Sequence, residues 1–271
     1  MFPLVVFILM LLLVSSKRGK LADSLLPDGS VHSKSSTSSS AYSSTMKTKG
    51  WAASTTIETG DGTPLIQGMV DDVAYYHCKA TKVKKVDAKN VVLLHGAKFT
   101  KENWKKSGIL SSLCRIDALQ VTALDLSVRA THSDLIRLFN SLEREGLVTR
   151  MPVTALITPS ASGGGVVDWI VQRTDVVRRL TKFVKVWIPV AANSVRRARQ
   201  DSLVYLKKLP NFSILSIHGN LDEGGRISSK LLSKHAGAKV VELQGTHPVY
   251  LDSPKEFVTT VTDYLAKLPQ Y

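Results

Sequence analysis

The sequence predicts an α/β protein whose mostly parallel sheet is covered by helices on both faces. Short, near-continuous apolar runs recur along the chain, and segments with a helical pattern separate them. Strands that are buried on both faces lose the polar alternation of a half-exposed strand, so these runs favour a parallel sheet. The 271 residues are 44% hydrophobic and 21% charged, which excludes a collagen-like, fully disordered or multi-span membrane protein.

The strands are predicted from their composition. Residues 73–80 (VAYYHCKA) combine aromatic and β-branched side chains, and residues 90–94 (NVVLL) and 153–158 (VTALIT) are apolar runs of strand length. Further strands of the same kind are expected at residues 118–125, 183–190, 212–219 and 238–245.

The helices are predicted from the spacing of apolar residues. Residues 101–113 form a polar, Trp-containing helical segment, and the leucines of residues 133–145 recur at helical spacing. A helix is expected after the turn at residues 159–163, and residues 253–268 form a closing amphipathic helix. Strands and helices therefore alternate along the folded part of the chain.

The N-terminal part is predicted to be a targeting leader followed by a linker. Residues 2–14 form an unbroken apolar run of 13, which is short for a membrane span but fits the core of a signal peptide. Basic residues follow this run instead of preceding it, so an uncleaved anchor of reversed orientation stays open. We expect residues 1–16 to be a signal peptide or signal anchor, residues 17–57 a Ser/Thr-rich disordered linker or transit segment, and residues 58–271 the folded domain.

This leader predicts entry into the secretory pathway or anchoring to a membrane. Residues 29–57 are Ser/Thr-rich, contain several lysines and have no acidic residue, a composition that is also typical of a plastid transit peptide. A signal followed by such a segment would suit import into a plastid bounded by extra membranes. Plastid import therefore stays open as the alternative location.

The cysteines and the charge narrow the range of partners. Cys78 and Cys114 cannot form a disulfide framework, and neither lies in a metal-ligand spacing, so a structural zinc site is excluded. The net charge is +14, but the densest basic clusters, at residues 178–179 and 196–199, contain no interleaved aromatic residues. We expect a solvated basic face, with an anionic substrate or a membrane headgroup as the alternative, and no nucleic-acid partner. No phosphate-loop pattern is present, and no cofactor or metal is expected.

Three residues that carry chemistry follow predicted strands in the order of a hydrolytic triad. Ser160 comes after the strand at residues 153–158, Asp222 follows the strand ending at residue 219, and His247 follows the last strand. The carboxyl ends of parallel strands meet at one edge of a sheet, so these side chains are expected to lie together. Serine, acid and histidine in this chain order are typical of an α/β-hydrolase triad.

Acyl-transfer chemistry explains why each residue type is needed. A serine hydroxyl is too weakly acidic to attack a carbonyl unless a neutral imidazole takes its proton and a carboxylate orients that imidazole. Ser160 is therefore the predicted nucleophile, His247 the base and Asp222 the acid. Backbone amides must meet the developing oxyanion, and those of Ala97 and Ala161 are predicted to do so.

Four neighbouring residues are rivals for these roles. Ser162 is a rival nucleophile, but it lies two residues too late to face the strand end. Glu223 adjoins Asp222 and is a rival acid. His218 and His132 are rival bases, and His218 ends a predicted strand, where a packed side chain is expected.

Several segments resemble the α/β-hydrolase domain-containing protein 14 family. This resemblance covers roughly residues 60–268 and implies a small, nearly lidless serine hydrolase, with the same three residues as its triad. It identifies residues 58–271 as an α/β-hydrolase domain with a minimal cap, and the apolar leader resembles the membrane-anchored branch of the family. The matching segments are residues 93–100 (LLHGAKFT) with Trp104, 158–163 (TPSASG), 189–191 (PVA), 218–222 (HGNLD) and 245–252 (GTHPVYLD).

The chain departs from that family at three segments. Residues 125–133 (DLSVRATHS) lack the glycines of the family's loop, and Gly163–Gly165 places three poor helix formers where a helix should begin. The segment with Arg196, Arg197 and Arg199 is unusually basic. Because these departures concern loops and a helix start, they affect the transfer of a substrate from the family more than the transfer of the fold.

We therefore predict a serine hydrolase that cleaves small acyl esters or thioesters through an acyl-Ser160 intermediate. Only residues 191–211 separate two of the later strands, which leaves no room for a large cap and indicates an open site for a small-molecule acyl substrate. Two alternatives stay open: an acyltransferase that passes the acyl group to an acceptor other than water, and a catalytically silent binding protein on the same fold. The oligomeric state is not predicted.

Overall fold

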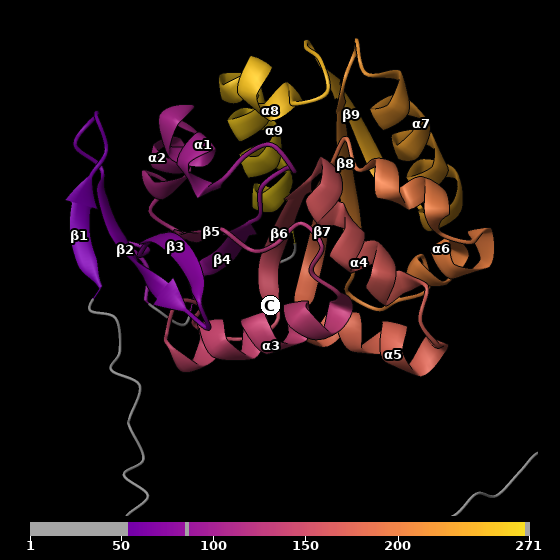
Figure 1. Ribbon diagram of the computed structural model, residues 1–271, viewed down its shortest axis with the longest axis horizontal. Helices are drawn as coiled ribbons and strands as arrows, with labels where there is room; N and C mark the ends of the chain where they lie inside the picture. Colours follow the sequence, from indigo (N-terminus) through magenta and orange to yellow (C-terminus); the bar gives the residue numbers. More distant parts are fainter. Residues whose placement is uncertain (1–53, 85–86, 269–271) are drawn as a thin grey trace, which may run out of the picture. The chain divides into compact units, whose positions relative to one another are not determined.

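The computed structural model describes residues 54–84 and 87–268. A nine-stranded sheet runs through this described part in the order β1-β2-β3-β5-β4-β6-β7-β8-β9 (Figure 1). The predicted signal segment, residues 1–16, lies outside the described residues, as does most of the predicted linker. The strands are β1 (Thr55–Glu58), β2 (Pro64–Val70), β3 (Val73–Cys78), β4 (Lys89–Leu93), β5 (Leu119–Leu124), β6 (Val153–Pro159), β7 (Val184–Val190), β8 (Ser213–Gly219) and β9 (Lys239–Leu243).

The sheet is mostly parallel, which confirms the predicted fold class. Strands β4 to β9 pair in parallel, whereas β1, β2 and β3 form an antiparallel edge that joins the parallel part through β5. In the register of the parallel part, Pro159 pairs with Val190 and Gly219 pairs with Leu243. The carboxyl ends of β6, β7, β8 and β9 therefore lie at one edge of the sheet.

Helices cover both faces of the sheet (Figure 1). Helices α1, α2, α8 and α9 share one hydrophobic cluster, and α3, α4, α5 and α6 contribute to the other, which also receives Leu232 just after α7. Their bounds are α1 (Lys101–Lys106), α2 (Ile109–Cys114), α3 (His132–Arg144), α4 (Gly163–Ile170), α5 (Thr174–Arg178), α6 (Gln200–Leu206), α7 (Glu223–Leu231), α8 (Val249–Asp252) and α9 (Pro254–Ala266), with short helical turns η2 (Ser160–Ser162), η3 (Arg179–Lys182), η4 (Asn193–Arg197) and η5 (Leu232–Ala236).

The central strands are buried because their side chains alternate between two cores. On β4, Val92 packs into the cluster with α3 and α4, whereas Val91 and Leu93 pack into the cluster with α2 and α9. All six residues of β5 are buried. This two-sided burial explains why the parallel strands read as continuous apolar runs in the sequence.

Helices α1 and α3 begin with matching capping boxes. Thr100 caps α1 and accepts a hydrogen bond from the backbone of the first turn, while Asn103 reaches back to the Thr100 amide. Thr131 and Asp134 form the same arrangement at α3. The predicted single helix at 101–113 is instead two helices, because Gly108 adopts a left-handed conformation (φ 75°) between α1 and α2.

The antiparallel edge differs most from the sequence-based expectation. Strands β1 and β2 were not predicted, and β1 begins at Thr55, within the segment expected to be linker. Side chains of β2 follow a mixed burial pattern, because this strand lies near the edge of the sheet and only Leu65 and Val70 are buried. A short edge strand with a half-polar pattern gives a weak sequence signal.

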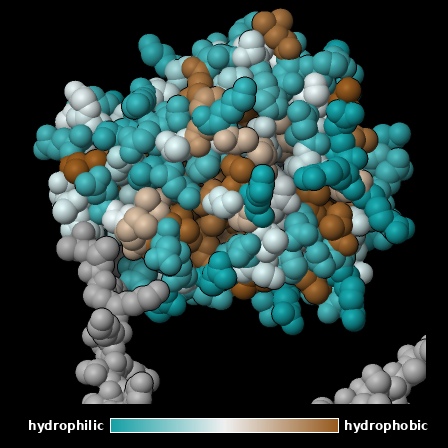
Figure 2. Space-filling view, viewed as in Figure 1, coloured by the Kyte–Doolittle hydropathy of each residue, from teal (hydrophilic) through white to brown (hydrophobic). Residues whose placement is uncertain are grey.

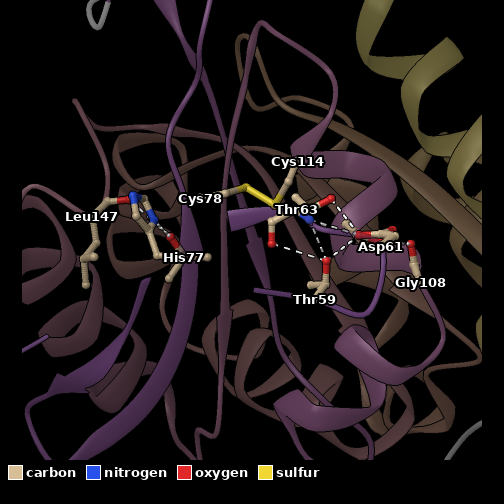
Figure 3. The surroundings of a disulfide bond; sticks show 10 residues. Thr59, Asp61, Thr63, His77, Cys78, Gly108, Cys114 and Leu147 are labelled. Atoms are coloured by element: carbon tan, nitrogen blue, oxygen red, sulfur yellow. Dashed lines mark hydrogen bonds between the residues drawn. A yellow bond between two sulfur atoms is a disulfide. The ribbon is translucent and has the colours of Figure 1, made fainter. Parts of the chain in front are cut away.

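The two cysteines are joined in one disulfide (Figure 3). Cys78 ends β3 and Cys114 ends α2, so the bond links the antiparallel edge of the sheet to a covering helix. The cysteine count excluded a framework of several bonds, but it did not reveal this single pair.

The face in Figure 2 is mostly hydrophilic, with smaller apolar patches between polar side chains. No helix of the described part is long and apolar enough to cross a membrane.

Candidate active site

Ser160 occupies a sharp turn between strand β6 and helix α4. The strand ends at Pro159, the turn η2 begins at Ser160, and Ser160 itself has a positive φ of 50°. A non-glycine residue in this region of backbone space is strained, and such strain is typical of a nucleophile elbow. Because of this turn, Ser160 lies at the edge of the sheet where the parallel strands have their carboxyl ends, and the residue is half-buried.

The triple glycine after Ser160 allows helix α4 to pack closely. A Cβ atom at Gly163 would lie 2.9 Å from the Cβ of Ala192, and one at Gly165 would lie 2.8 Å from the carbonyl oxygen of Ala130. Both distances are shorter than real Cβ contacts allow. Two of the three glycines are therefore required by packing, which explains a departure that helix propensity alone makes unfavourable.

Thr158 fits the elbow despite its β-branched side chain. It is fully buried, and its Oγ1 accepts a hydrogen bond of 2.8 Å from the indole Nε1 of Trp187. A Cβ at Gly163 would lie at an ordinary contact distance, 3.6 Å, from Thr158 Oγ1, so Thr158 itself does not require that glycine. The hydroxyl is thus satisfied in the core, and the turn is formed without the first glycine of G-x-S-x-G.

The structure brings Ser160, His247 and Asp222 together in one hydrogen-bonded chain. Nε2 of His247 lies 2.7 Å from Oγ of Ser160, and Nδ1 of the same ring lies 2.7 Å from Oδ2 of Asp222. The Asp222 side chain is 9% exposed, and that of His247 is 40% exposed. A nucleophile, an imidazole and an orienting carboxylate at these separations have the geometry that acyl transfer requires.

Close backbone approach positions the acid and the histidine. A Cβ at Gly219 would lie 2.3 Å from the carbonyl oxygen of Thr246, so the end of β8 passes directly beside the loop before His247. A Cβ at Gly225 would lie 2.4 Å from Oδ2 of Asp222. Glycine at both positions is needed to bring the carboxylate against the imidazole.

Side-chain hydrogen bonds hold the same two loops. Asn220 donates from Nδ2 to Oε1 of Gln244 at 2.8 Å, and its Oδ1 accepts from the amide of Gly245 at 2.9 Å. The carboxylate of Asp252 accepts from the amide and the hydroxyl of Thr246, both at 2.6 Å. Sequence reasoning did not single out Asn220 and Asp252 as positioning residues, although both lie in the segments that resemble the family.

The predicted oxyanion segment lies beside the nucleophile. A Cβ at Gly96 would be 3.8 Å from Cβ of Ser160, and Ala97 follows in an exposed turn closed by the amide of Phe99 and the carbonyl of Gly96. Ala161 is the first residue after Ser160. The indole of Trp104 donates to the carbonyl of Leu94 at 3.0 Å and so anchors the start of this segment.

A buried tyrosine packs behind this turn. The rings of Tyr250 and Phe99 have centroids 6.2 Å apart, and Tyr250 also stacks on Trp104 at 4.5 Å. Burial raises the pKa of the Tyr250 hydroxyl well above its usual range, so this hydroxyl stays neutral. Tyr250 follows His247 by three residues, and its packing therefore connects the histidine loop to the oxyanion segment.

The rival residues occupy other positions. Ser162 is buried and donates to the carbonyl of Pro159 at 2.9 Å, and Glu223 is exposed and pairs with Arg226. His218 is buried with Nε2 3.2 Å from Glu242, and His132 pairs with Asp168 at 2.9 Å. None of the four belongs to the hydrogen-bonded chain that Ser160 forms with His247 and Asp222.

A pocket of about 650 Å³ opens beside Ser160. A larger cavity, of about 750 Å³, lies at the opposite edge of the sheet, where β4, β8 and β9 begin. Ser160, His247 and Asp222 do not line this cavity. We take the smaller pocket as the candidate site, because the hydrogen-bonded nucleophile Ser160 lines it. Among residues 54–84 and 87–268, no cluster of histidine, cysteine or acidic side chains could hold a metal ion.

Comparison with known proteins finds sequence relatives of this chain. No protein-family model matches the chain. The Danio rerio protein ABHD14A is 32% identical over 192 residues, which are 66% of this chain and 64% of that protein, so the match spans less than two thirds of this relative. The Homo sapiens protein named "Putative protein-lysine deacylase ABHD14B" is 28% identical over 222 residues, which are 78% of this chain and 98% of that protein.

Solved structures show the same fold. A CIB-like hydrolase from Thermoplasma acidophilum superposes with a TM-score of 0.56 at 21% identity, covering 80% of this chain and 100% of that one. The esterase RhEst1 from Rhodococcus sp. superposes with a TM-score of 0.52 at 15% identity, covering 80% and 99%. The sequence matches confirm the resemblance to the ABHD14 proteins, and these structures show that the chain has the α/β-hydrolase fold.

Proposed function

We propose that the protein is a serine hydrolase that cleaves small acyl esters or thioesters through an acyl-Ser160 intermediate. The observation that carries this proposal is the continuous hydrogen-bonded chain from Ser160 through His247 to Asp222, with Ser160 held at a strained strand-to-helix turn. Hydrolysis at this site is supported by the kinship with the ABHD14 proteins and by the shared fold.

The proposed reaction has two halves. His247 takes the proton of Ser160 as the hydroxyl attacks the acyl carbon, and Asp222 stabilises the imidazolium that forms. His247 then gives the proton to the departing alcohol or thiol, which leaves an acyl-serine. A water molecule, activated by His247 in the same way, releases the acid and restores Ser160.

The oxyanion of each tetrahedral intermediate is assigned to the amides of Ala97 and Ala161. Two observations support this assignment: Ala161 directly follows the nucleophile, and Ala97 follows Gly96, which lies beside Ser160. Loss of one such donor typically costs about 3–4 kcal/mol of transition-state stabilisation. These two amides are therefore expected to be as important for the rate as the side chains.

The short segment between β7 and β8 supports the proposal that the substrates carry small or exposed acyl groups. Residues 191–212 form only η4 and the seven-residue helix α6, so this segment forms no cap domain over Ser160. The same acyl-enzyme could pass its acyl group to an acceptor other than water. An acylated lysine of a protein is a further candidate acyl donor, because the relative ABHD14B carries the name of a protein-lysine deacylase.

Labelling of the full-length protein with a fluorophosphonate probe tests the nucleophile. The parent protein should be labelled, Ser160→Ala should not, and Ser162→Ala should serve as the matched control that keeps its label if it folds. Circular dichroism of each variant checks folding. A well-folded parent that resists the probe would overturn the hydrolase proposal and favour the catalytically silent binding protein.

We further propose that the chain enters the secretory pathway, with a plastid reached through the secretory pathway as the alternative. The apolar run at residues 2–14 and the Cys78–Cys114 disulfide support this location, since disulfides persist mainly in oxidising compartments. The same run is the proposed means of membrane association. Mass spectrometry of the native N-terminus tests the leader: a start beyond residue 16 indicates cleavage, and a start at Met1 excludes it.

A further inference from the structure

The segments that depart from the family converge on one pocket. Residues from the loop after β5, from the triple glycine and from the turn η4 all line the cavity of about 650 Å³ beside the nucleophile. In the sequence these segments lie apart, at residues 128–131, 163–165 and 193–197, and no sequence pattern connects them. The lining residues include Arg129, Ser160, Ala161, Gly164, Asp168 and Arg197.

Two arginines give this pocket its charge. Arg129 and Arg197 are both exposed, and within the described residues no carboxylate forms an ion pair with either guanidinium group. A Cβ at Gly164 would lie 3.8 Å from a guanidinium nitrogen of Arg197, so this side chain extends over the start of helix α4. Both cations are therefore available to a ligand in the pocket.

The one acidic side chain of the pocket already has partners. Asp168 accepts hydrogen bonds of 2.9 Å from the backbone amide and from the ring Nδ1 of His132. Burial acts to raise the pKa of Asp168, but these hydrogen bonds outweigh it and hold the pKa below its usual value. Asp168 is thus ionised and bound by His132, and the two arginines leave an excess of positive charge.

The pocket lies on the acyl side of the proposed reaction. His247 must protonate the departing group, so the departing group lies next to the His247 ring. No residue of the loop that carries His247 is among those that line the pocket, whereas Ser160 and Ala161 are. The pocket therefore extends from the nucleophile on the side away from the departing group, where the acyl chain lies.

We propose that this pocket selects acyl groups that carry a carboxylate at their far end, such as the half-esters or half-thioesters of dicarboxylic acids. The inference rests on the proposed function, because it assigns a substrate class to the same nucleophile. Arginine suits this role, since its planar fork binds a carboxylate through two parallel hydrogen bonds. Exposure of both side chains limits the preference to about tenfold, equivalent to 1.4 kcal/mol.

Three esters with the same leaving group test the charge preference on the full-length protein. Mono-4-nitrophenyl adipate, 4-nitrophenyl hexanoate and 4-nitrophenyl 6-aminohexanoate differ mainly in a negative, absent or positive charge at the end of the acyl chain. We expect kcat/KM to fall in that order, with the adipate ester about tenfold above the hexanoate ester. The ratio should shrink as salt is raised, because the arginines are exposed.

Charge-reversal variants assign the preference to the two arginines. Arg197→Glu and Arg129→Glu should each lower the adipate-to-hexanoate ratio of kcat/KM to one or below. Arg196→Glu is the matched control, because Arg196 is an exposed neighbour in η4 that does not line the pocket, and it should keep the ratio. A ratio that falls equally in the control would mean a general effect of net charge and would overturn the proposal.

A charged leaving group distinguishes the two sides of the site. If the two arginines raise kcat/KM for 4-carboxyphenyl hexanoate and not for the adipate ester, the assignment of the pocket to the acyl side is overturned. Failure of this inference is separable from failure of the proposed function: equal cleavage of all three acyl esters by a protein that the fluorophosphonate labels contradicts only the inference. Should turnover be too slow to measure, adipate must slow fluorophosphonate labelling more than hexanoate does, and equal protection would overturn the proposal.

Discussion

Two Ser–His–Asp arrangements occur among residues 54–84 and 87–268, and their surroundings differ. At the candidate site, His247 lies 2.7 Å from Asp222 and 2.7 Å from Ser160. At the start of helix α3, Nδ1 of His132 lies 2.9 Å from Asp168, and Nε2 lies 3.4 Å from the hydroxyl of the next residue, Ser133. Both histidines therefore face a carboxylate with one nitrogen and a serine with the other.

The backbone around each serine separates the two arrangements. Ser160 is at a strand end with a positive φ, next to the turn that carries Gly96, whereas Ser133 is an exposed residue in the first turn of an ordinary helix. Asp168 also accepts the backbone amide of His132, so that pair fastens α3 to α4. A histidine–aspartate pair is thus a common structural contact, and it indicates catalysis only where a strained nucleophile and oxyanion donors lie beside it.

Replacing each of the two histidines in turn should give the largest difference in hydrolysis rate between the two arrangements. His247→Ala is expected to lower kcat by about 10⁴-fold or more, because Ser160 loses its base. His132→Ala should leave kcat/KM for 4-nitrophenyl hexanoate within about twofold, since a surface contact away from the reacting atoms is lost. Steady-state hydrolysis measures both, and a large rate loss in the folded His132 variant would contradict the distinction drawn between the two sites.

Replacing the two aspartates should give a smaller contrast of the same kind. Asp222→Asn is expected to lower kcat by about 10²- to 10⁴-fold, because the amide no longer holds the His247 tautomer that accepts the Ser160 proton. Asp168→Asn should instead lower the free energy of unfolding by up to about 1 kcal/mol, with little change in the hydrolysis of neutral esters. Urea unfolding and hydrolysis rates of the same samples separate these effects.

The Asp168 effect should also depend on pH. The pKa of Asp168 is lower in the folded state than in the unfolded chain, so its stabilising contribution is present above the unfolded pKa and is lost as the pH falls through the folded pKa. The difference in unfolding free energy between the parent protein and Asp168→Asn should therefore shrink in acid. A difference that grows on acidification would show that Asp168 does not act through its charged form.

Substitutions of two neighbouring glycines should change the free energy of unfolding with opposite signs. Gly165→Ala is expected to destabilise the protein by about 1–3 kcal/mol, because its Cβ would meet the carbonyl of Ala130 and separate α4 from the loop before His132. Gly164→Ala is the matched control: its Cβ meets only Arg197 at an ordinary distance, so helix propensity should stabilise it by about 0.5–1 kcal/mol. Urea unfolding measures both, and equal changes would contradict the close packing of α4.

Much of the fold could be predicted because the central strands are buried on both sides. Continuous apolar runs such as residues 153–158 have few alternatives to a parallel strand when helical segments flank them. The antiparallel strands β1 and β2 were missed because an edge strand keeps a half-polar pattern. The break between α1 and α2 was missed because a glycine within a helical pattern can be either tolerated or a terminus, and here Gly108 is left-handed.

The site could be predicted only in part, for a related reason. Ser160, Asp222 and His247 stood out because each follows a strand, and strand ends share one edge of the sheet. From the sequence, Asn220 and Asp252 could not be distinguished from ordinary loop residues, because their positioning contacts form only between folded loops. The disulfide between Cys78 and Cys114 gave no signal beyond the presence of two cysteines, since pairing depends on where β3 and α2 lie.

The sequence by itself determined the class of fold, the order of the strands from β3 to β9 along the chain and the three residue types that could perform acyl transfer. These depend on local patterns, which hydrophobic burial and strand connectivity make readable. The tertiary structure alone decided which histidine meets a strained serine, why the triple glycine is needed and that Arg129 and Arg197 share a pocket. Those outcomes depend on close approaches between segments far apart in the chain, such as Gly219 against Thr246, and such contacts arise only when the backbone is folded.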